Sequence, residues 1–170
     1  MSKFKQADIS ALNFNPFTKI SKEWMLVTAG SEQKNNTMTA SWGGVGVLWN
    51  KNVSFVFIRP QRYTLGFIEQ QDCYSLCFFD EEYRAALSYC GTKSGRDVDK
   101  VKETGLTPVY DEAAPYFAQA KLVLICRKLY KQDIDASCIL ADGIDHANYP
   151  NKDYHKMFIG EIEKVLIKEE

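Results

Sequence analysis

Two arginines, a tyrosine and a threonine lie close together in the segment Arg59-Pro60-Gln61-Arg62-Tyr63-Thr64, between an apolar stretch and a helix-favouring one. Guanidinium groups donate paired, planar hydrogen bonds that suit a phosphate, and the free N–H groups at the start of a helix favour an anion. Thr64 can cap that helix or donate its hydroxyl to a phosphate oxygen. The segment therefore predicts a phosphate-binding turn carried by Arg59, Arg62, Tyr63 and Thr64. The alternative is a solvated loop whose arginines pair with surface carboxylates.

A second cationic loop has the sequence Lys93-Ser94-Gly95-Arg96-Asp97-Val98-Asp99-Lys100. Gly95 frees the backbone, Ser94 offers a hydroxyl, and the cations Lys93, Arg96 and Lys100 follow one another along a loop that leads into a helix. Such a loop can reach a phosphate or an anionic ring. A solvated charged turn is the alternative, because the two aspartates reduce its positive charge.

A third segment is rich in small hydrogen-bonding residues and ends in an indole: Asn36, Thr37, Met38, Thr39, Ala40, Ser41, Trp42. If the segment is extended, alternate side chains face one way, and its exposed backbone groups can pair with the edge of a planar heterocycle. Trp42 could then cover the face of the ring. An ordinary strand with exposed threonine and serine side chains has the same pattern.

The chain has two histidines, His146 and His155. Neither belongs to a pattern such as H-E-x-x-H, so no metal site is expected. His155 opens a long apolar strand, where it is either a hydrogen-bonded structural residue or a proton donor to a bound substrate. No Ser–His–Asp or Cys–His nucleophile is marked by spacing.

These residues need elements to position them, and strands dominate the pattern. About six strands are expected, over residues 24–29, 37–42, 53–58, 72–79, 120–130 and 154–167. The glycine-rich residues 43–46 are expected to form a flexible connection. They lack the spacing of a G-x-G-x-x-G nucleotide fingerprint.

Short helices are expected over residues 63–70, 80–90 and 97–104, with Asp80 as an N-cap and with Gly91 and Gly105 at C-terminal ends. Residues 134–144 show only a helical turn. No regular alternation of strand with long helix appears, which disfavours a doubly wound parallel sheet. The pattern favours a mainly β fold with short inserted helices, a closed or partly closed barrel.

Length and composition narrow the classes of function. The chain of 170 residues has 45% hydrophobic and 25% charged residues, which is typical of one globular domain spanning residues 1–170. Its 21 basic and 22 acidic residues nearly cancel, so nucleic acid is not an expected partner. The sequence shows no signal peptide and no apolar run long enough to cross a bilayer, so no membrane association and a cytoplasmic location are expected. The five cysteines show no zinc spacing and are interpreted as small buried hydrophobes in a reducing compartment.

Four motifs occur in a fixed order: residues 36–43, 59–64 and 94–100, and then His155-Lys156-Met157-Phe158-Ile159-Gly160-Glu161-Ile162. Together they resemble the flavin reductase-like family with an FMN-binding split barrel, most closely its flavoredoxin branch, over residues 15–168. The resemblance implies a Greek-key split β-barrel, a homodimer, and non-covalent FMN near the subunit interface. It places residues 36–42 beside the isoalloxazine and ribityl groups, and the 59–64 and 94–100 segments at the phosphate and ring edges. His155 would lie where a nicotinamide or acceptor could stack.

The resemblance also implies an activity. NAD(P)H would stack transiently on the flavin and pass hydride to it, and an acceptor such as free flavin or a ferric chelate would receive the electrons. A flavoredoxin-type electron carrier reduced by a protein donor is the main alternative. A non-enzymatic domain that holds haem or sequesters flavin is a third, since one fold hosts several functions.

Overall fold

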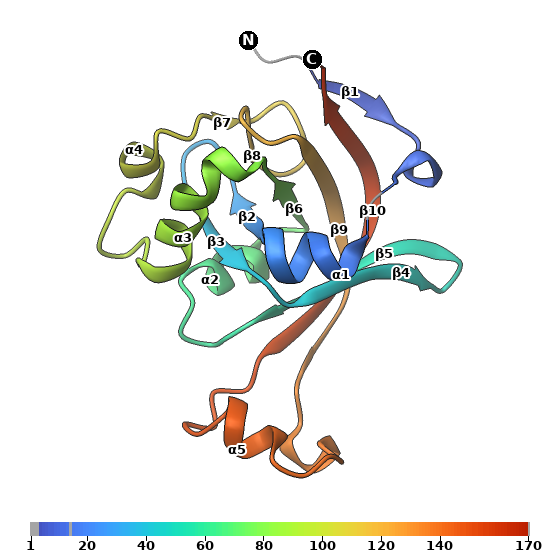
Figure 1. Cartoon of the computed structure of the whole chain (residues 1–170), viewed down its shortest axis with the longest axis vertical. Coiled ribbons are helices and arrows are strands. Elements are labelled where there is room, and N and C mark those ends of the chain that lie inside the picture. Colours follow the sequence, from blue (N-terminus) through green and yellow to red (C-terminus); the bar gives the residue numbers. More distant parts are fainter. Residues whose placement is uncertain (1–3, 14, 170) are drawn as a thin grey trace.

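The structure, a computed structural model, describes residues 4–13 and 15–169. Figure 1 shows a curved sheet with short helices beside it and an arm that projects away from the body. The strands are β1 (Phe4–Ala7), β2 (Met25–Gly30), β3 (Asn35–Ala40), β4 (Gly43–Leu48), β5 (Lys51–Ile58), β6 (Cys73–Phe78), β7 (Pro108–Val109), β8 (Tyr116–Phe117), β9 (Leu122–Asp133) and β10 (Lys156–Lys168). The helices are α1 (Pro16–Thr18), α2 (Thr64–Gln70), α3 (Arg84–Thr92), α4 (Lys100–Thr104) and α5 (Ile144–Asn148). Single 3-10 or π turns occur at Ile9–Ala11, Lys19–Glu23, Glu81–Tyr83 and Ala136–Cys138.

One eight-stranded sheet has the order β3-β2-β6-β9-β10-β5-β4, and β1 pairs with β10 beside this path. Each of its ladders is antiparallel. β3 and β4 end the order at opposite edges, yet only Ser41 and Trp42 separate them in the sequence. The sheet must therefore curl until its two edges meet at this connection. It stays open there, because no ladder joins β3 to β4 in the described part of the chain. The mainly β, partly closed barrel predicted from the sequence is confirmed, and its opening lies beside Trp42.

Two layers of apolar side chains hold the sheet in place. Every residue of β2 and β6 is buried, and successive side chains of a strand point to opposite faces. Val27 accordingly belongs to the cluster inside the barrel with Ile58, Tyr74 and Phe158. Leu26 belongs to an outer cluster in which Leu87 of α3 takes part. The outer cluster fastens α3 to the sheet next to β3.

The short helices begin and end near the predicted residues, with two differences. α4 begins at Lys100 rather than near residue 97, since the side chain of Asp99 accepts the Lys102 N–H at 3.1 Å as an N-cap. It ends at Gly105, whose φ of 68° is the left-handed conformation expected there. Gly91 is not a cap, because α3 continues to Thr92.

The sequence pattern missed several strands. Residues 43–46 were expected to be a flexible connection, but they form β4 and pair with β5 from Gly43↔Val56 onward. Glycine has little strand propensity, which hid this edge strand. A Cβ on Gly43, where φ is +150°, would lie 2.6 Å from the Phe55 carbonyl oxygen, so the glycine permits the close approach. The strands β1, β7 and β8, of four, two and two residues, are too short to show a period.

Residues 134–155 form an arm between β9 and β10 that carries α5 (Figure 1). Two apolar side chains of the arm, Leu140 and Ile144, are exposed, as is Cys138. The other four cysteines are buried as expected: Cys73, Cys77, Cys90, Cys126. Tyr149 and His155, where the arm returns to β10, are buried.

Candidate functional site

A groove runs along β3, formed by two adjoining cavities of about 160 Å³ and 240 Å³. The two cavities share Met38, Arg59 and Arg62, and we call them together the β3 groove. The smaller cavity is lined by Met38, Thr39, Ala40, Ser41, Trp42, Phe57, Arg59, Arg62 and His155. The larger is lined by Met38, Arg59, Gln61, Arg62, Tyr63, Thr64, Thr92, Lys93, Ser94, Gly95 and Lys100. Thirteen of the sixteen candidate residues therefore line one groove.

The topology explains why the groove has a hydrogen-bonding wall. β3 is an edge strand, paired only with β2, so one row of its backbone N–H and C=O groups has no strand partner. α3 packs against the outer face of β3 and not against this edge, and the Thr39 hydroxyl donates to the Leu87 carbonyl oxygen. The backbone row beside Met38, Thr39 and Ala40 is therefore available to a planar ligand with donors and acceptors on its edge.

Two candidate cations close the end of α3. The last carbonyl groups of a helix lack helical donors, and here Arg62 donates to the Gly91 oxygen at 2.6 Å while Lys100 donates to the Cys90 oxygen at 2.8 Å. Lys100 also donates to the Thr37 oxygen of β3 at 2.7 Å. Burial, followed by the neighbouring Arg59, lowers the pKa of Arg62. Burial and then the charge of Arg62 lower the pKa of Lys100, with Cys90 acting in the opposite direction.

Neither of these cations pairs with a carboxylate in the described residues. Lys100 is only 6% exposed, and a buried charge without a counter-charge is costly. Arg62 and Lys100 both line the larger cavity. The larger half of the β3 groove is therefore suited to an anion.

The three predicted segments, 36–42, 59–64 and 93–100, meet through contacts of Asn36, Thr64 and Gly95. The Asn36 amide donates to the Thr64 hydroxyl at 2.7 Å, which joins β3 to the start of α2. A Cβ on Gly95 would lie 2.0 Å from Asn36 Oδ1 and 3.2 Å from the Tyr63 ring, so only glycine lets the loop approach this closely. Arg96 stacks over the Tyr63 ring at 4.7 Å. The expectation that Thr64 caps α2 is wrong, because Tyr63 occupies the N-cap position without a side-chain bond.

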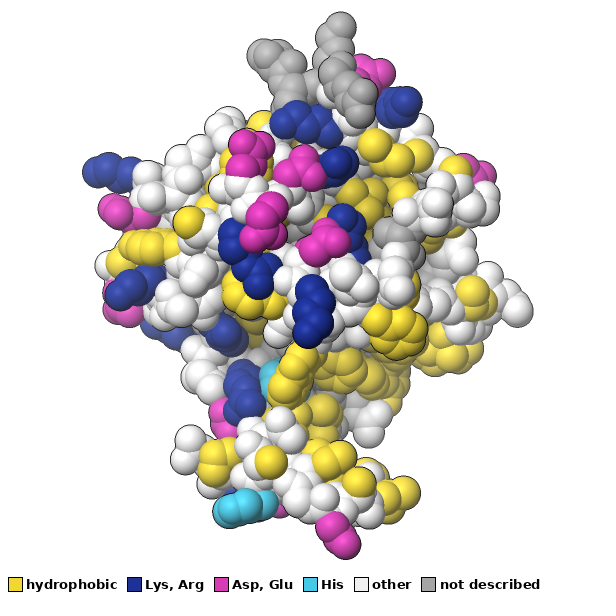
Figure 2. Space-filling model, in the orientation of Figure 1, with side chains coloured by type: hydrophobic (Ala, Val, Ile, Leu, Met, Phe, Trp, Pro, Cys, Tyr) yellow, Lys and Arg dark blue, Asp and Glu magenta, His cyan; other side chains and the backbone are white. Residues whose placement is uncertain are grey.

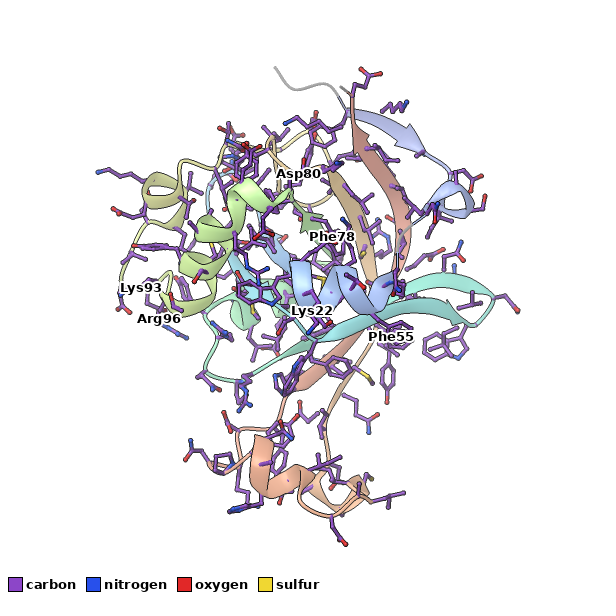
Figure 3. The ribbon with its side chains drawn as sticks, viewed as in Figure 1. Lys22, Phe55, Phe78, Asp80, Lys93 and Arg96 are labelled. Carbon is purple, nitrogen blue, oxygen red and sulfur yellow. The ribbon has the colours of Figure 1, made fainter. Side chains whose placement is uncertain are left out.

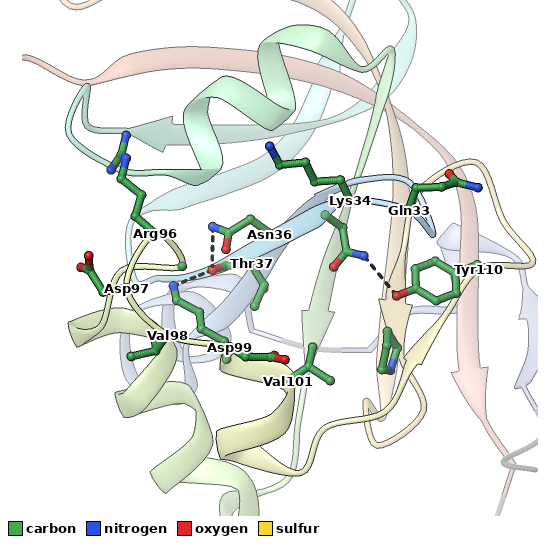
Figure 4. Close-up of a pocket in the computed structure, with 14 residues that line it drawn as sticks. Gln33, Lys34, Asn36, Thr37, Arg96, Asp97, Val98, Asp99, Val101 and Tyr110 are labelled. Atoms are coloured by element: carbon green, nitrogen blue, oxygen red, sulfur yellow. Dashed lines mark hydrogen bonds between the residues drawn. The ribbon is translucent and has the colours of Figure 1, made fainter.

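Lys93 and Arg96 lie at the edge of the molecule near α3 and α4 (Figure 3). Both are exposed, and neither forms an ion pair among the residues the structure describes. Arg96 does not line the β3 groove. With Asn36 and Thr37 it lines a third cavity of about 570 Å³, which adjoins the groove at Gly95 and Lys100 and is shown in Figure 4. This cavity of about 570 Å³ has mixed charge because Asp97 and Asp99 also line it.

His155 lies at the other end of the β3 groove, in contact with Trp42. Their ring centroids are 5.2 Å apart, and the Tyr149 hydroxyl is 2.9 Å from His155 Nδ1. Burial, then the charges of Arg59 and Arg62, lowers the pKa of His155 to about 4, with Asp153 acting in the opposite direction. A neutral imidazole does not suit the role of proton donor near neutral pH. Neutral His155 can instead hydrogen-bond to a ligand.

Sequence reasoning did not find three residues at this end: Phe57, Tyr149 and Asp153. Phe57 lines the smaller cavity, and Asp153 pairs with Arg59 and accepts a hydrogen bond from Gln61 at 2.8 Å. The Arg59–Asp153 pair is a solvated-loop feature of the kind weighed as the alternative for the 59–64 turn. His146 lies on α5, exposed and away from the groove.

The described residues contain neither a membrane-spanning helix nor a cluster of metal-binding side chains. No helix among them is long and apolar enough to cross a membrane. No three histidine, cysteine, aspartate or glutamate side chains in the described ranges gather as they would around a metal ion.

The fold and the groove define a class: an antiparallel split barrel with a cationic groove along its free edge strand. Comparison with family models matches residues 17–170 to the flavin reductase like domain. The chain belongs to this family, and the split barrel implied by the four motifs is confirmed.

Solved structures at low identity share the fold. Flavoredoxin from Methanosarcina acetivorans is 23% identical with a TM-score of 0.67, over 84% of this chain and 67% of that one. An FMN-binding domain of a flavin reductase-like enzyme from Shewanella baltica is 16% identical with a TM-score of 0.69, over 98% and 78%. The NADH:FAD oxidoreductase of Streptomyces globisporus is 16% identical with a TM-score of 0.63, over 86% and 77%. The comparison with curated proteins found no match.

Proposed function

We propose that the protein binds FMN non-covalently in the β3 groove and uses it to accept electrons from NAD(P)H. The observation that carries the proposal is the combination, in one groove, of a free β-strand edge with buried Lys100 and half-buried Arg62, neither of which pairs with a carboxylate in the described residues. Flavin has a planar ring with donors and acceptors on its edge and a phosphate at the end of its ribityl chain. The groove offers a partner for each.

The residues present fit the cofactor. In the larger cavity, half-buried Arg62 and buried Lys100 supply positive charge, and Thr64 and Ser94 line the same space with hydroxyl groups. Arginine and hydroxyl donors suit phosphate oxygens. Exposed Lys93 lies at the rim of this cavity and adds a solvated cation.

The smaller cavity fits one end of the flavin ring system. Its wall is the edge of β3 from Met38 to Ala40, and Trp42, 48% exposed, lies at the opening of the barrel. FMN, when bound, supplies a ring that takes up hydride and passes electrons on. The protein orients the ring through the β3 edge, while Trp42 and His155 border the space beside it. No nucleotide-binding fold is present for the dinucleotide among the described elements, so we expect NAD(P)H to bind briefly.

Related solved structures support flavin chemistry in this fold. An FMN-binding protein from Thermus thermophilus, 20% identical, was solved with 1-cyclohex-2-enone. The relatives also include an NADH:FAD oxidoreductase and a flavoredoxin of Desulfovibrio vulgaris. A reductase and an electron carrier are therefore both consistent with the family, and the electron donor distinguishes them.

The decisive experiment is an anaerobic titration of the FMN-loaded protein with NADH and with NADPH, recorded by flavin absorbance. Rapid bleaching is the expected result. Flavin that binds but is not bleached would reject nicotinamide-dependent reduction and favour the flavoredoxin-type carrier with a protein donor. If no flavin binds, the proposal fails.

We also propose that the protein is a homodimer. Figure 2 shows apolar side chains gathered where the body meets the arm. Several large apolar side chains are exposed in the β4–β5 hairpin, β9 and the arm: Val47, Trp49, Tyr130, Leu140, Ile144. An apolar surface of this kind indicates a contact. Light scattering coupled to size exclusion should give twice the monomer mass, and a monomeric mass for the FMN-loaded protein would reject the dimer.

A further inference from the structure

Tyr149 and His155 form a buried pair that the expected flavin chemistry does not explain. Tyr149 is 4% exposed and His155 is 7% exposed, and their hydrogen bond of 2.9 Å uses Nδ1 of the imidazole. Tyr149 comes from the end of the arm, just after α5, and not from the sheet. The arm thereby reaches into the smaller cavity through the histidine ring.

The direction of this hydrogen bond follows from the partners of the phenol. Burial raises the pKa of Tyr149, and Asp153 adds to this, while Arg59 and the backbone N–H of His155 act the other way. The phenol therefore keeps its proton. Within the described residues Nδ1 is the side-chain partner found for this hydroxyl, so a proton on Nδ1 would leave the buried O–H without an acceptor. Tyr149 must donate to Nδ1.

A neutral imidazole that accepts at Nδ1 carries its proton on Nε2. The charged groups around the ring keep it neutral: Arg59 and Arg62 oppose a further positive charge, and Asp153, which favours one, is already paired with Arg59. No hydrogen bond to Nε2 is found in the described part of the chain, and His155 lines the smaller cavity. Nε2–H is thus a free donor at the wall of that cavity.

The size of the cavity limits what can meet this donor. Its volume is about 160 Å³, close to the cavity of about 150 Å³ that accepts one benzene-sized ring, so it can take one end of the flavin ring system or the nicotinamide ring. Trp42 and Phe57 give this space two aromatic walls, and Arg59 and Arg62 add further hydrogen-bond donors to it. An N–H donor beside aromatic walls and two guanidinium groups suits a planar ring that bears a carbonyl oxygen, because a ring edge with only donors would face other donors.

We propose that Tyr149 is a positioning residue that fixes His155 as a neutral Nε2–H donor to a ring carbonyl in the smaller cavity. The carbonyl would belong either to the flavin ring or to the carboxamide of the nicotinamide, and the assignment of these two sources rests on the proposed function. The tautomer itself does not rest on it. The tautomer can therefore be tested with or without flavin chemistry.

The test is ¹⁵N NMR of the imidazoles in the full-length protein, with and without FMN. The chain has only two histidines, so His146→Gln assigns both signals. The nitrogen without a proton resonates far downfield of the protonated one, and the expected result for His155 is a downfield Nδ1 and an upfield Nε2 near neutral pH. In Tyr149→Phe the two tautomers should mix. Tyr154→Phe is the matched control, since that hydroxyl bonds to Asp145 at 2.7 Å and not to His155.

A proton on Nδ1 in the wild type, or an unchanged tautomer in folded Tyr149→Phe, would overturn the proposal. Binding then identifies the source of the carbonyl. If it is the flavin, Tyr149→Phe should raise the Kd for FMN about three- to tenfold; if it is the nicotinamide, the KM for NADH should rise by that factor with kcat little changed. His155→Gln, whose amide reaches the Nε2 position, should keep more of this affinity than His155→Asn. Equal losses in these two variants, or no change in Kd and KM in Tyr149→Phe, would also overturn it.

Discussion

Acidification should destabilise the folded protein through His155. The pKa of this histidine is lowered from 6.5 to about 4, chiefly by burial, so between these values the unfolded chain binds a proton that the folded chain does not. Stability therefore rises with pH through this interval and is lost as the pH falls from about 6.5 toward 4. Above about pH 6.5 both states are neutral at this site and the term vanishes.

The size of the effect follows from the same two values. One pKa unit corresponds to about 1.4 kcal/mol, so the complete loss is about 3 kcal/mol. At about pH 4.5 most of the interval has been crossed, and the groove gives the ring some contact with solvent, which leaves an expected loss of about 2 kcal/mol. This is a large part of the stability of an ordinary domain.

Urea unfolding at about pH 7.5 and about pH 4.5 measures this loss. Carboxylates also titrate over that range, so the comparison is between variants. Wild type should lose about 2 kcal/mol more than His155→Gln between the two pH values, and His146→Gln, which alters an exposed residue of α5, should behave as wild type. Equal losses in wild type and His155→Gln would refute the buried neutral state of His155 and the reasoning built on it.

Three further substitutions test the groove and the core. Lys100→Met removes an ammonium that bridges α3 and β3. It should lower the free energy of unfolding, measured with urea, by about 1–3 kcal/mol and raise the Kd for FMN, measured by fluorescence titration, about tenfold. Substitution of exposed Lys102 by methionine should change neither quantity. Gly95→Ala would place a Cβ 2.0 Å from an oxygen of β3 and should weaken FMN binding, whereas Gly66→Ala, with nothing within 4 Å, should stabilise α2 by about 0.5–1 kcal/mol. Gly160→Ala would place a Cβ 2.4 Å from a buried tyrosine oxygen and should cost about 2 kcal/mol by thermal unfolding without changing the shape of the flavin spectrum.

The strands with strong apolar patterns were predictable, and those whose role depends on a neighbour were not. The stretches 53–58 and 72–79 read as strands and form most of β5 and β6. β4 was missed because its residues are mostly glycine, and it exists by pairing with β5 across a tight turn. Burial in β5 is also less complete than its run of apolar residues indicates: Phe55 and Phe57 are only partly buried.

The site was predictable in its composition but not in its bonding. The sequence predicted that these cations bind an anion. The structure shows that Arg62 and Lys100 already donate hydrogen bonds to the carbonyl oxygens at the end of α3. Those contacts join residues far apart in the chain, and no local pattern encodes them. The partner of His155 was equally hidden, since a tyrosine six residues earlier in an irregular arm carries no periodic signal.

The double use of the cations has a consequence for ligand binding. Lys100 is buried, Arg62 is half-buried, and carbonyl oxygens fix both side chains before any anion enters, so binding has less to desolvate and to order. Exposed Lys93 is solvated and can attract an anion from a distance, which affects the rate of association and its dependence on salt. If FMN binds as proposed, Arg62 and Lys100 would instead determine how long its phosphate stays. The groove would then separate attraction, at its rim, from retention, at the end of α3, and substitutions at the two places should alter different rate constants for the same flavin.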